Sequence, residues 1–377
     1  MWQPQRIYNQ FLLRTPVFLS GSGSAQGLYN YPGARVAIIH GSSLKEADKE
    51  LFLSTFKKKE IHFIHRSWKG EPDIDGLSAT IHELESFCPE LIIAFGGGSV
   101  IDGVKLCRFF YEFPYFQMDN FKFEEAVFKT KFIAIPTTVG SGSEVSSAAV
   151  YIDKGRRRKE MLVMHDLQPD VVVYDEEYVR YTPKELLCTS VLDAAAHILE
   201  GYVSNIDNSM ADIMAEEGLF LIREEMDKLK KGSAEGIDFG RLQYAGYLGG
   251  VVQNHCIVGA AHAVAHQMAE YGYSHGEAVS LLLPAVICMN EKDRTSKRKY
   301  MTIAKRAGFS SVHAMTEYMR DLMFEAGLEN QITAFKEKLT ECQKDQMFFE
   351  NVRNDKGGKG NPIPITQGYL DNLIRSI

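Results

Sequence analysis

The chain has few cysteines, and none of them stand at the short paired spacing of a metal ribbon. Six are present among 377 residues, mostly in apolar contexts: Cys88, Cys107, Cys188, Cys256, Cys288 and Cys342. A disulfide framework or a zinc ribbon needs regularly paired cysteines. The pattern excludes both classes and indicates reduced, buried thiols. We therefore expect a cytoplasmic protein.

Long apolar runs and a strong excess of one charge are also lacking. The segments Phe11-Leu12-Leu13 and Val17-Phe18-Leu19 are much shorter than the roughly 20 apolar residues that cross a bilayer. The formal net charge of -7 argues against a nucleic-acid partner or an anionic membrane. One basic cluster, residues 156–159, is expected to be a solvated turn, with a phosphate contact as the alternative. We predict neither a nucleic-acid nor a membrane partner.

Residues 35–175 alternate between short apolar runs and amphipathic stretches. Strands are expected at 36–40, 61–64, 91–95, 131–136 and 171–174. Helices are expected between them, at 45–57, 74–87 and 99–110. Near-continuous Val/Ile runs that alternate with helices predict a parallel sheet covered on both faces.

The pattern changes after about residue 183, where helical periodicity dominates. Helices are expected at 183–203, 208–231, 238–252, 257–270, 277–290, 297–307 and 311–326. A polar loop at 354–361 precedes a last short helix. We predict an α/β domain over residues 1–180 and an all-helical domain over residues 181–377.

A glycine-rich loop, Gly96-Gly97-Gly98-Ser99, follows the expected strand at 91–95 and opens a helix. Glycines let the backbone approach a pyrophosphate, and the start of a helix supplies N–H donors. The loop is not the GxGxxG of the usual dinucleotide fingerprint, and a structural turn is the alternative. Its strand-loop-helix context favours phosphate binding.

A second polar loop, residues 136–144, also follows a strand. Its hydroxyls and glycines suit contact with a cofactor or substrate at the carboxyl edge of an open sheet. In the alternative interpretation its Ser and Thr residues cap the next helix.

Aspartate and histidines recur at helical spacing in the second half of the chain. Asp193 and His197 form one (i, i+4) pair, and His262 and His266 form another, with His275 nearby. Such pairs project from one helix face, so two faces and a third histidine could surround one divalent ion. A carboxylate with imidazoles suits Fe(II) or Zn(II) better than Mg or Ca. A structural role is the alternative for each residue taken alone.

These motifs, in this order, resemble the iron-containing alcohol dehydrogenase family, which is related to glycerol dehydrogenase and dehydroquinate synthase. The resemblance runs over Gly96–Asp102, Thr137–Glu144, Asp193–His197 and His262–Gly276, and closes on Asn361-Pro362-x-Pro364. It implies a dehydroquinate synthase-like fold: an N-terminal dinucleotide-binding domain and a C-terminal helical domain, with the active site in the cleft between them.

The resemblance also implies the site residues. The four metal ligands would be Asp193, His197, His262 and His275, with Fe(2+) as the metal and Zn(2+) as the alternative. His266 matches a histidine near the nicotinamide and would act as a proton relay. In the alternative interpretation, His266 is an exposed neighbour of His262 on the same helix face and has no role in the reaction.

The implied cofactor is NADP or NAD. By resemblance its contacts would be Gly97, Gly98, Ser99, Asp102, Thr137, Thr138, Ser141, Ser143 and Lys159. The expected first strand is followed by Gly41, Ser43 and Lys45. An acidic residue here would hold a ribose 2′-OH and is characteristic of NAD binding, but none is present. This stretch resembles NADP-preferring members and favours NADP, unless Lys45 simply begins an exposed helix.

The implied reaction is metal-dependent hydride transfer between an alcohol and an aldehyde or ketone, an oxidoreductase activity. Two departures from simple alcohol dehydrogenases leave the substrate open: the polar pair Gln253-Asn254 and the segment His275-Gly276-Glu277. They suggest a polyhydroxylated substrate. The alternatives are a polyol or sugar-acid enzyme of the octulosonate type, a dehydroquinate synthase-like cyclase, and a non-catalytic nucleotide-binding protein. The family also implies a homodimer, formed through apolar runs within residues 1–20.

Overall fold

The computed structural model describes residues 16–116, 126–155, 158–230 and 236–377. These residues form two compact units. We call residues 16–138 and 143–182 the α/β unit, and residues 139–142 and 183–377 the helical unit. The run Phe11-Leu12-Leu13 and most of the segment expected to form a dimer lie outside the described residues.

Six parallel strands form the main sheet of the α/β unit. Their bounds are β1 Val17–Ser20, β2 Arg35–His40, β3 Glu60–His65, β4 Leu91–Gly96, β5 Lys131–Pro136 and β8 Val171–Tyr174. The strand order is β1-β8-β5-β4-β2-β3. His40 pairs with Phe95, and Gly96 pairs with Pro136. The loops that follow β2, β4 and β5 therefore leave the same edge of the sheet.

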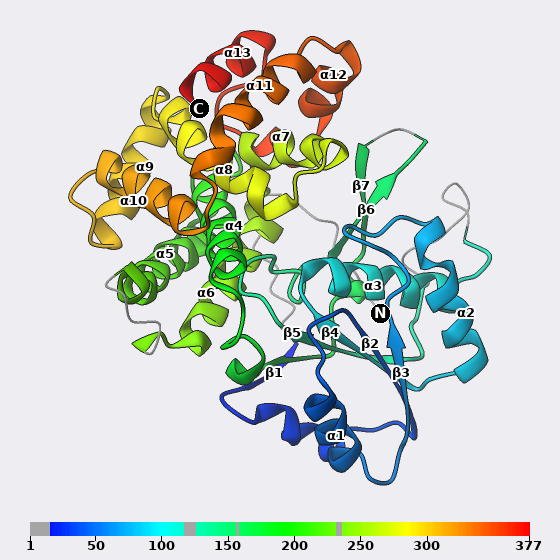
Figure 1. Ribbon diagram of the computed structural model, residues 1–377. Coiled ribbons are helices and arrows are strands. Elements are labelled where there is room, and N and C mark those ends of the chain that lie inside the picture. The colour runs from blue at the N-terminus through cyan, green and yellow to red at the C-terminus, as the bar shows by residue number, and fades with distance from the viewer. Residues whose placement is uncertain (1–15, 117–125, 156–157, 231–235) are drawn as a thin grey trace. The chain divides into compact units, whose positions relative to one another are not determined.

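Helices cover both faces of this sheet, as the predicted parallel fold requires (Figure 1). Their bounds are α1 Glu46–Thr55, α2 Ser78–Phe87 and α3 Gly98–Glu112. Phe52 and Phe56, at the end of α1, are buried in one hydrophobic core with alternate residues of β2 and β4. The other face carries α2 and α3. Burial on both faces explains why β4 is apolar throughout.

A two-stranded antiparallel hairpin was not expected from the sequence. It joins β6 Ala148–Asp153 to β7 Arg158–Val163. The prediction of a solvated turn at 156–159 was wrong for its last two residues, because Arg158 and Lys159 belong to β7. The side chain of Lys159 is only 4% exposed. Residues 156–157 lie outside the described part of the chain.

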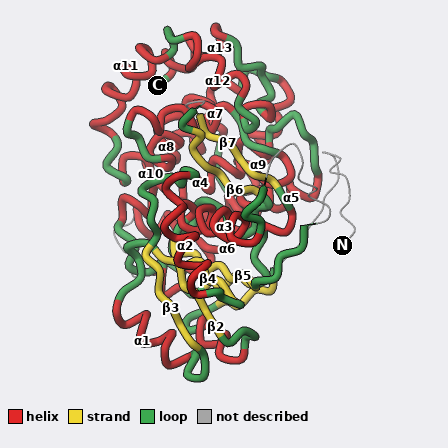
Figure 2. The backbone as a smooth tube through the Cα atoms, turned by 90° about the vertical axis from the view of Figure 1, so that its right-hand side faces the viewer, coloured by secondary structure: helices red, strands yellow, loops and turns green. Residues whose placement is uncertain are grey.

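Every strand that the structure describes belongs to the α/β unit, whereas the helical unit contains helices alone (Figure 2). Its helices are α4 Lys184–Tyr202, α5 Ser209–Lys230, α6 Phe239–Cys256, α7 Ala260–Met268, α8 His275–Asn290, α9 Arg294–Arg306, α10 Val312–Glu325, α11 Ile332–Cys342, α12 Gln346–Asn354 and α13 Gln367–Ser376. The sequence analysis missed α11 and α12. Across the described ranges, no helix is long and apolar enough to cross a membrane.

Helix α4 lies at the centre of the helical unit. Every residue from Leu187 to Tyr202 is buried. Gly249 of α6 allows close packing, because an added Cβ there would lie 3.1 Å from the Ala194 carbonyl oxygen and 3.4 Å from the His197 Cβ. Polar side chains on α4 are thus removed from water, so they must bond to one another, to neighbouring segments or to a ligand.

We predict opposite effects for two helical glycine substitutions. In Gly103→Ala the new Cβ would lie 2.1 Å from Cζ2 of the buried Trp68, so the free energy of unfolding should fall by about 1–3 kcal/mol. The control is Gly368→Ala, at an exposed position of α13, where the new Cβ meets only Thr366 Oγ1 at 3.9 Å. This substitution should raise the free energy of unfolding by about 0.5–1 kcal/mol. Urea unfolding measures both, and equal stabilisation by the two substitutions would contradict the packing described.

Candidate metal centre and cofactor loop

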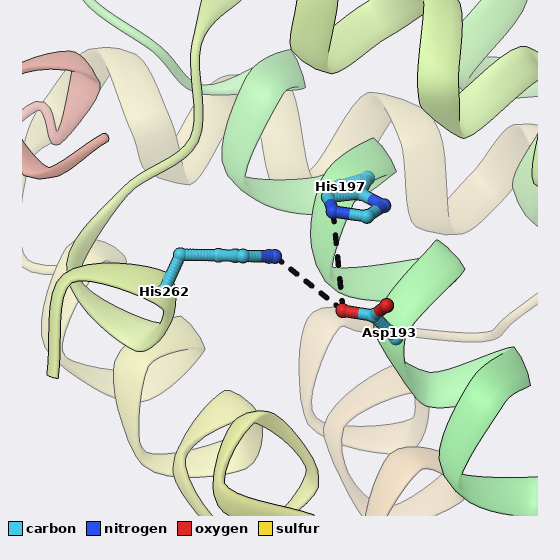
Figure 3. Close-up of side chains that lie close together, drawn as sticks. All are labelled: Asp193, His197 and His262. Carbon is cyan, nitrogen blue, oxygen red and sulfur yellow. Dashed lines mark ion pairs between the residues drawn. The ribbon is translucent and has the colours of Figure 1, made fainter. Parts of the chain in front are cut away.

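Two of the predicted ligands lie one helical turn apart on α4. The His197 Nε2 atom lies 3.9 Å from Oδ1 of Asp193, and both side chains are almost fully buried. Successive turns of a helix bring residues i and i+4 onto one face, as the spacing predicted. Figure 3 shows the two side chains on α4 with His262 facing them from α7.

The other two predicted ligands converge on the same carboxylate oxygen. The Nε2 atoms of His262 and of His275, the first residue of α8, each lie 3.5 Å from Asp193 Oδ1. Ligand atoms of Asp193, His197 and His262 all lie within 4.8 Å of one another. The structure thus brings together four residues that are separated by up to 82 positions in the chain.

An acceptor behind two of the histidines fixes which ring nitrogen faces Asp193. Nδ1 of His197 lies 3.2 Å from the Gly140 carbonyl oxygen, and Nδ1 of His262 lies 2.6 Å from Glu200 Oε2. A carbonyl or a carboxylate only accepts, so each Nδ1 carries the proton and donates it. Nε2 of each ring is left for the space around Asp193.

The segment 139–142 reaches His197 because glycines let it approach the helices closely. An added Cβ at Gly140 would lie 2.3 Å from the Ser190 carbonyl oxygen of α4. At Gly246 of α6 it would lie 2.3 Å from the carbonyl oxygen of Val139. This part of the polar loop 136–144 therefore supports His197, one of the predicted ligands, a role that was not expected from the sequence. No helix follows the loop, which leads into β6, so its alternative as a helix cap was wrong.

Glu200 is a site residue that the sequence analysis missed. Its Oε1 accepts a hydrogen bond from the Ala261 amide, while Asn361 Oδ1 accepts one from the Ala260 amide. Together they cap α7, which has no side-chain cap of its own. Glu200 lies seven residues after Asp193 and three after His197, so the same helical spacing could have revealed it.

Burial and charge set the protonation of these groups. Burial lowers the pKa of His197 to about 4, against the opposing charge of Asp193. Burial would also lower the pKa of His262, but the neighbouring carboxylates of Asp193 and Glu200 outweigh it and raise the pKa to about 9. Burial raises the pKa of Asp193, yet the surrounding imidazoles bring it below its usual range. A carboxylate and one imidazolium thus share this buried space.

The four residues fit a divalent metal ion. Neither Asp193 Oδ1 nor His262 Nε2 has a hydrogen-bond partner, although both atoms are buried. A buried polar atom without a partner costs free energy, and a cation among them would remove that cost. One carboxylate and three imidazoles suit Fe(II) or Zn(II).

His266 lies beside this cluster and is held by an aspartate. Its Nδ1 lies 2.8 Å from Asp355 Oδ2, and its ring stacks on His275 with centroids 5.4 Å apart. Asp355 Oδ1 accepts a hydrogen bond of 2.8 Å from the Gly357 amide. Burial raises the pKa of Asp355, but His266 and the backbone amides outweigh it and lower the pKa overall. The ionised carboxylate orients the ring so that Nε2 is its free position.

The predicted phosphate loop stands at the start of α3. Gly97 is the N-cap residue, and Gly98 and Ser99 open the helix. No side chain caps this terminus, and no acidic residue lies in its first turn. Free N–H groups at the start of a 15-residue helix suit a phosphate. Thr138 packs closely here, with Cγ2 3.1 Å from where a Cβ of Gly97 would lie.

Three further predicted contacts lie in the polar loop 136–144. Thr137 and Ser143 are buried in the α/β unit. Ser141 belongs to the helical unit, where its carbonyl oxygen accepts a hydrogen bond of 2.8 Å from Gln253 Nε2. Gln253, one of the residues that suggested a polyhydroxylated substrate, therefore has a structural partner.

Two predicted cofactor contacts already have partners within the α/β unit. Asp102 Oδ2 accepts a hydrogen bond of 3.1 Å from the Val150 amide, and Oδ1 lies 3.5 Å from Lys105 Nζ. Lys159 Nζ lies 3.1 Å from Glu71 Oε1. These contacts tie α3 and β7 to their neighbours, and the cofactor roles of both residues stay predictions.

The three residues that favoured NADP follow β2. Gly41 stands directly after the strand, and Ser43 and Lys45 precede α1. The Lys45 ammonium lies 4.9 Å above the Tyr181 ring, and the Lys45 amide donates to Asp48 Oδ2. Their contacts with the cofactor stay predictions.

We predict that Glu200→Gln weakens metal binding more than it weakens the fold. The Gln oxygen can still cap α7, but its amide would donate to His262 Nδ1 and move the ring proton to Nε2. Loss of such an outer carboxylate typically costs about 10–100-fold in metal affinity. Zn(II) titration calorimetry measures the loss. Glu225→Gln is the control, because this equally buried carboxylate contacts Lys228 and the Asp238 amide instead of a histidine. Equal losses in both variants would contradict a specific role for Glu200.

The protonation of His262 also predicts a pH dependence. Below its raised pKa of about 9 the ring is protonated, so an incoming ion must displace that proton. His197, with a pKa of about 4, has none to lose at neutral pH. Zn(II) affinity should therefore rise about tenfold per unit between roughly pH 6 and 8, with about one proton released per ion. Calorimetry in buffers of different ionisation enthalpy counts the proton, and an affinity independent of pH would contradict the prediction.

Comparisons with known proteins cover both units. Residues 16–176 match the family model of iron-containing alcohol dehydrogenase, and residues 187–377 match that of the C-terminal part of the Fe-containing alcohol dehydrogenase family.

Individual relatives agree with the family match. An NADPH-dependent butanol dehydrogenase of Clostridium saccharobutylicum is 30% identical over 95% of each chain. An alcohol dehydrogenase of Thermococcus barophilus is 30% identical over 75% of this chain and 73% of its own. The solved iron-containing alcohol dehydrogenase of Thermococcus thioreducens superposes with a TM-score of 0.83 at 26% identity, covering 97% of this chain and 99% of the other. The protein belongs to the iron-containing alcohol dehydrogenase family of oxidoreductases.

Proposed function

We propose that the protein interconverts an alcohol and an aldehyde or ketone by hydride transfer, using a divalent metal and NADP or NAD. The observation that carries the proposal is the convergence of three imidazole nitrogens on Asp193 Oδ1 inside the helical unit. Butanol and alcohol dehydrogenase activities among its relatives support the same reaction.

The helical unit would be the metal-binding domain, corresponding to the predicted residues 181–377. Asp193, His197, His262 and His275 would hold Fe(II), with Zn(II) as the alternative. A bound ion of this kind supplies Lewis acidity to the oxygen of an alcohol or carbonyl. Gly140 and Glu200 would support ion binding indirectly, because each accepts a hydrogen bond from Nδ1 of a histidine and so orients that ring.

The α/β unit would be the dinucleotide-binding domain, corresponding to the predicted residues 1–180. The uncapped start of α3, at Gly97–Ser99, would receive the pyrophosphate. A bound nicotinamide supplies or accepts the hydride. The residues that we propose to line its site are those predicted from the sequence: Gly41, Ser43, Lys45, Asp102, Thr137, Thr138, Ser141, Ser143 and Lys159.

His266 would move the proton that alcohol oxidation releases. Because Asp355 accepts from Nδ1, the Nε2 atom of a neutral ring is an acceptor and can take a proton. In the reductive direction the same nitrogen returns it. Asp355 is a positioning residue in this scheme and fixes the tautomer that makes Nε2 basic.

Two features bear on the alternatives. Glu277 forms a capping box with Ser274 at the start of α8. The segment His275-Gly276-Glu277, one of the two departures from simple alcohol dehydrogenases, therefore has a local structural explanation, which favours the dehydrogenase over the cyclase. The amide of Gln253 is occupied by Ser141, so a polyhydroxylated substrate stays a prediction that a substrate panel must test. A cytoplasmic location and a homodimer are also part of this proposal.

The decisive experiment is anaerobic reconstitution with Fe(II), followed by NADPH or NADH oxidation with a panel of carbonyl compounds. The panel runs from simple aldehydes to polyhydroxy ketones and sugar acids, and His262→Ala is the control. Turnover that disappears in the variant supports the proposal. Bound metal and cofactor without net cofactor oxidation on any carbonyl would contradict it and favour a cyclase.

We further predict that Asp355→Asn lowers kcat about 10–100-fold and shifts its pH profile while leaving KM for the carbonyl nearly unchanged. The asparagine amide can donate to Nδ1 and stabilise the tautomer in which Nε2 already carries a proton. Asp345→Asn is the control, because Asp345 caps the opposite end of the same helix α12 and asparagine caps equally well. Steady-state kinetics over pH 6–9 tests this, and an unchanged kcat and profile in Asp355→Asn would contradict the positioning role.

A further inference from the structure

The α/β unit contains a cation at the position where such folds distinguish NADP from NAD. In dinucleotide-binding sheets, the ribose 2′ group lies at the end of the strand next to the glycine-loop strand. The strand β4 has two such neighbours, β2 and β5. We consider β2, because the stretch that favoured NADP in the sequence begins with Gly41, directly after this strand. Gly41 offers no side chain, so a group from elsewhere in the fold can lie directly beside it.

Arg66, directly after β3, supplies a guanidinium group at this position. If Gly41 carried a Cβ, that atom would lie 3.7 Å from Arg66 Nε. Nη1 of Arg66 donates to Ser99 Oγ at 2.8 Å and to the Gly70 carbonyl oxygen at 3.2 Å. The side chain thus spans from the end of β2 to the first turn of α3. Pairing between β2 and β3, with His40 opposite His65, creates this arrangement.

Arg66 donates no hydrogen bond to a carboxylate, although the negative charge of Glu71 acts on it. Its two hydrogen-bond acceptors, a hydroxyl and a carbonyl, are both neutral. The nearby Glu71 is engaged by Lys159 Nζ at 3.1 Å. Within the described ranges, no ion pair of Arg66 occurs. A planar guanidinium with donors to spare matches a phosphate, which accepts two parallel hydrogen bonds.

Lys45, the basic residue that the sequence had suggested for this role, is oriented differently. Its ammonium lies 4.9 Å above the ring of Tyr181. Arg66 was overlooked because it lies 25 positions beyond Gly41 in the sequence, and only the pairing of β2 with β3 makes them neighbours.

We propose that Arg66 binds the 2′-phosphate of NADP(H) beside Gly41 and thereby makes the protein selective for NADP over NAD. The inference rests on the proposed nicotinamide-dependent function and names the residue that determines its cofactor specificity.

The test measures binding of cofactor fragments, so it requires neither metal nor turnover. Calorimetry compares adenosine 2′,5′-bisphosphate with AMP, and nicotinamide fluorescence compares NADPH with NADH. The variants are Arg66→Ala and Arg66→Gln, the second of which keeps a hydrogen-bond donor without the charge. Arg35→Ala is the matched control, because this exposed arginine begins β2 at the opposite edge of the sheet.

The wild-type protein should bind NADPH and the bisphosphate more tightly than NADH and AMP. Both Arg66 variants should lose about 10–100-fold in affinity for the phosphorylated ligands and at most about twofold for the others. Arg35→Ala should change neither. Equal losses for both ligand classes would place Arg66 at the pyrophosphate and overturn the proposal. Variants that keep the wild-type selectivity for NADPH would also overturn it. If no nicotinamide cofactor binds at all, the proposed function fails together with the inference, whereas NADH-selective binding overturns the inference alone.

Discussion

The helical unit is organised around one buried carboxylate oxygen that its own neighbours cannot satisfy. Asp193 Oδ1 faces three imidazole nitrogens at 3.5–3.9 Å, beyond the 2.7–3.2 Å typical of an N–H···O hydrogen bond. Polar groups that are removed from water at such spacing are costly unless a further ligand joins them. A divalent cation held by these residues would supply the opposite charge and the ligand that the buried atoms lack, which explains why the chain tolerates this arrangement.

The surrounding packing follows from the need to present Nε2 atoms to that space. Each supporting acceptor must reach Nδ1, on the side of the imidazole ring away from Asp193. Glycines allow this close approach of the chain segments. Gly140 brings its carbonyl oxygen to His197, in contact with α4. Glu200 reaches His262 while it caps α7, where an added Cβ at Gly259 would lie 2.8 Å from Glu200 Oε1. The same side chains therefore fix the fold and the protonation state of the site.

Sequence patterns predicted what depends on local spacing, and they failed where distant segments meet. Val/Ile runs identified the strands β2, β4 and β5, and the (i, i+4) pairs identified Asp193, His197 and His262. His275, the third histidine at Asp193, belonged to neither pair and was expected from its place nearby and from the resemblance. Asp355 and Arg66 were missed, because their partners His266 and Gly41 lie 89 and 25 positions away and no periodic pattern connects them. The short edge strand β1, with Val17 largely exposed, also gave no clear strand pattern.

The central claim is that Asp193, His197, His262 and His275 bind one divalent ion. X-ray absorption spectroscopy of the Fe(II)- or Zn(II)-loaded protein tests it most directly. The account predicts one ion per chain, nitrogen and oxygen neighbours at about 2.0–2.2 Å, and the outer-shell scattering of several imidazoles. His262→Ala should remove one imidazole contribution or abolish binding. A spectrum without imidazole scattering, or one unchanged in His262→Ala, would contradict the account.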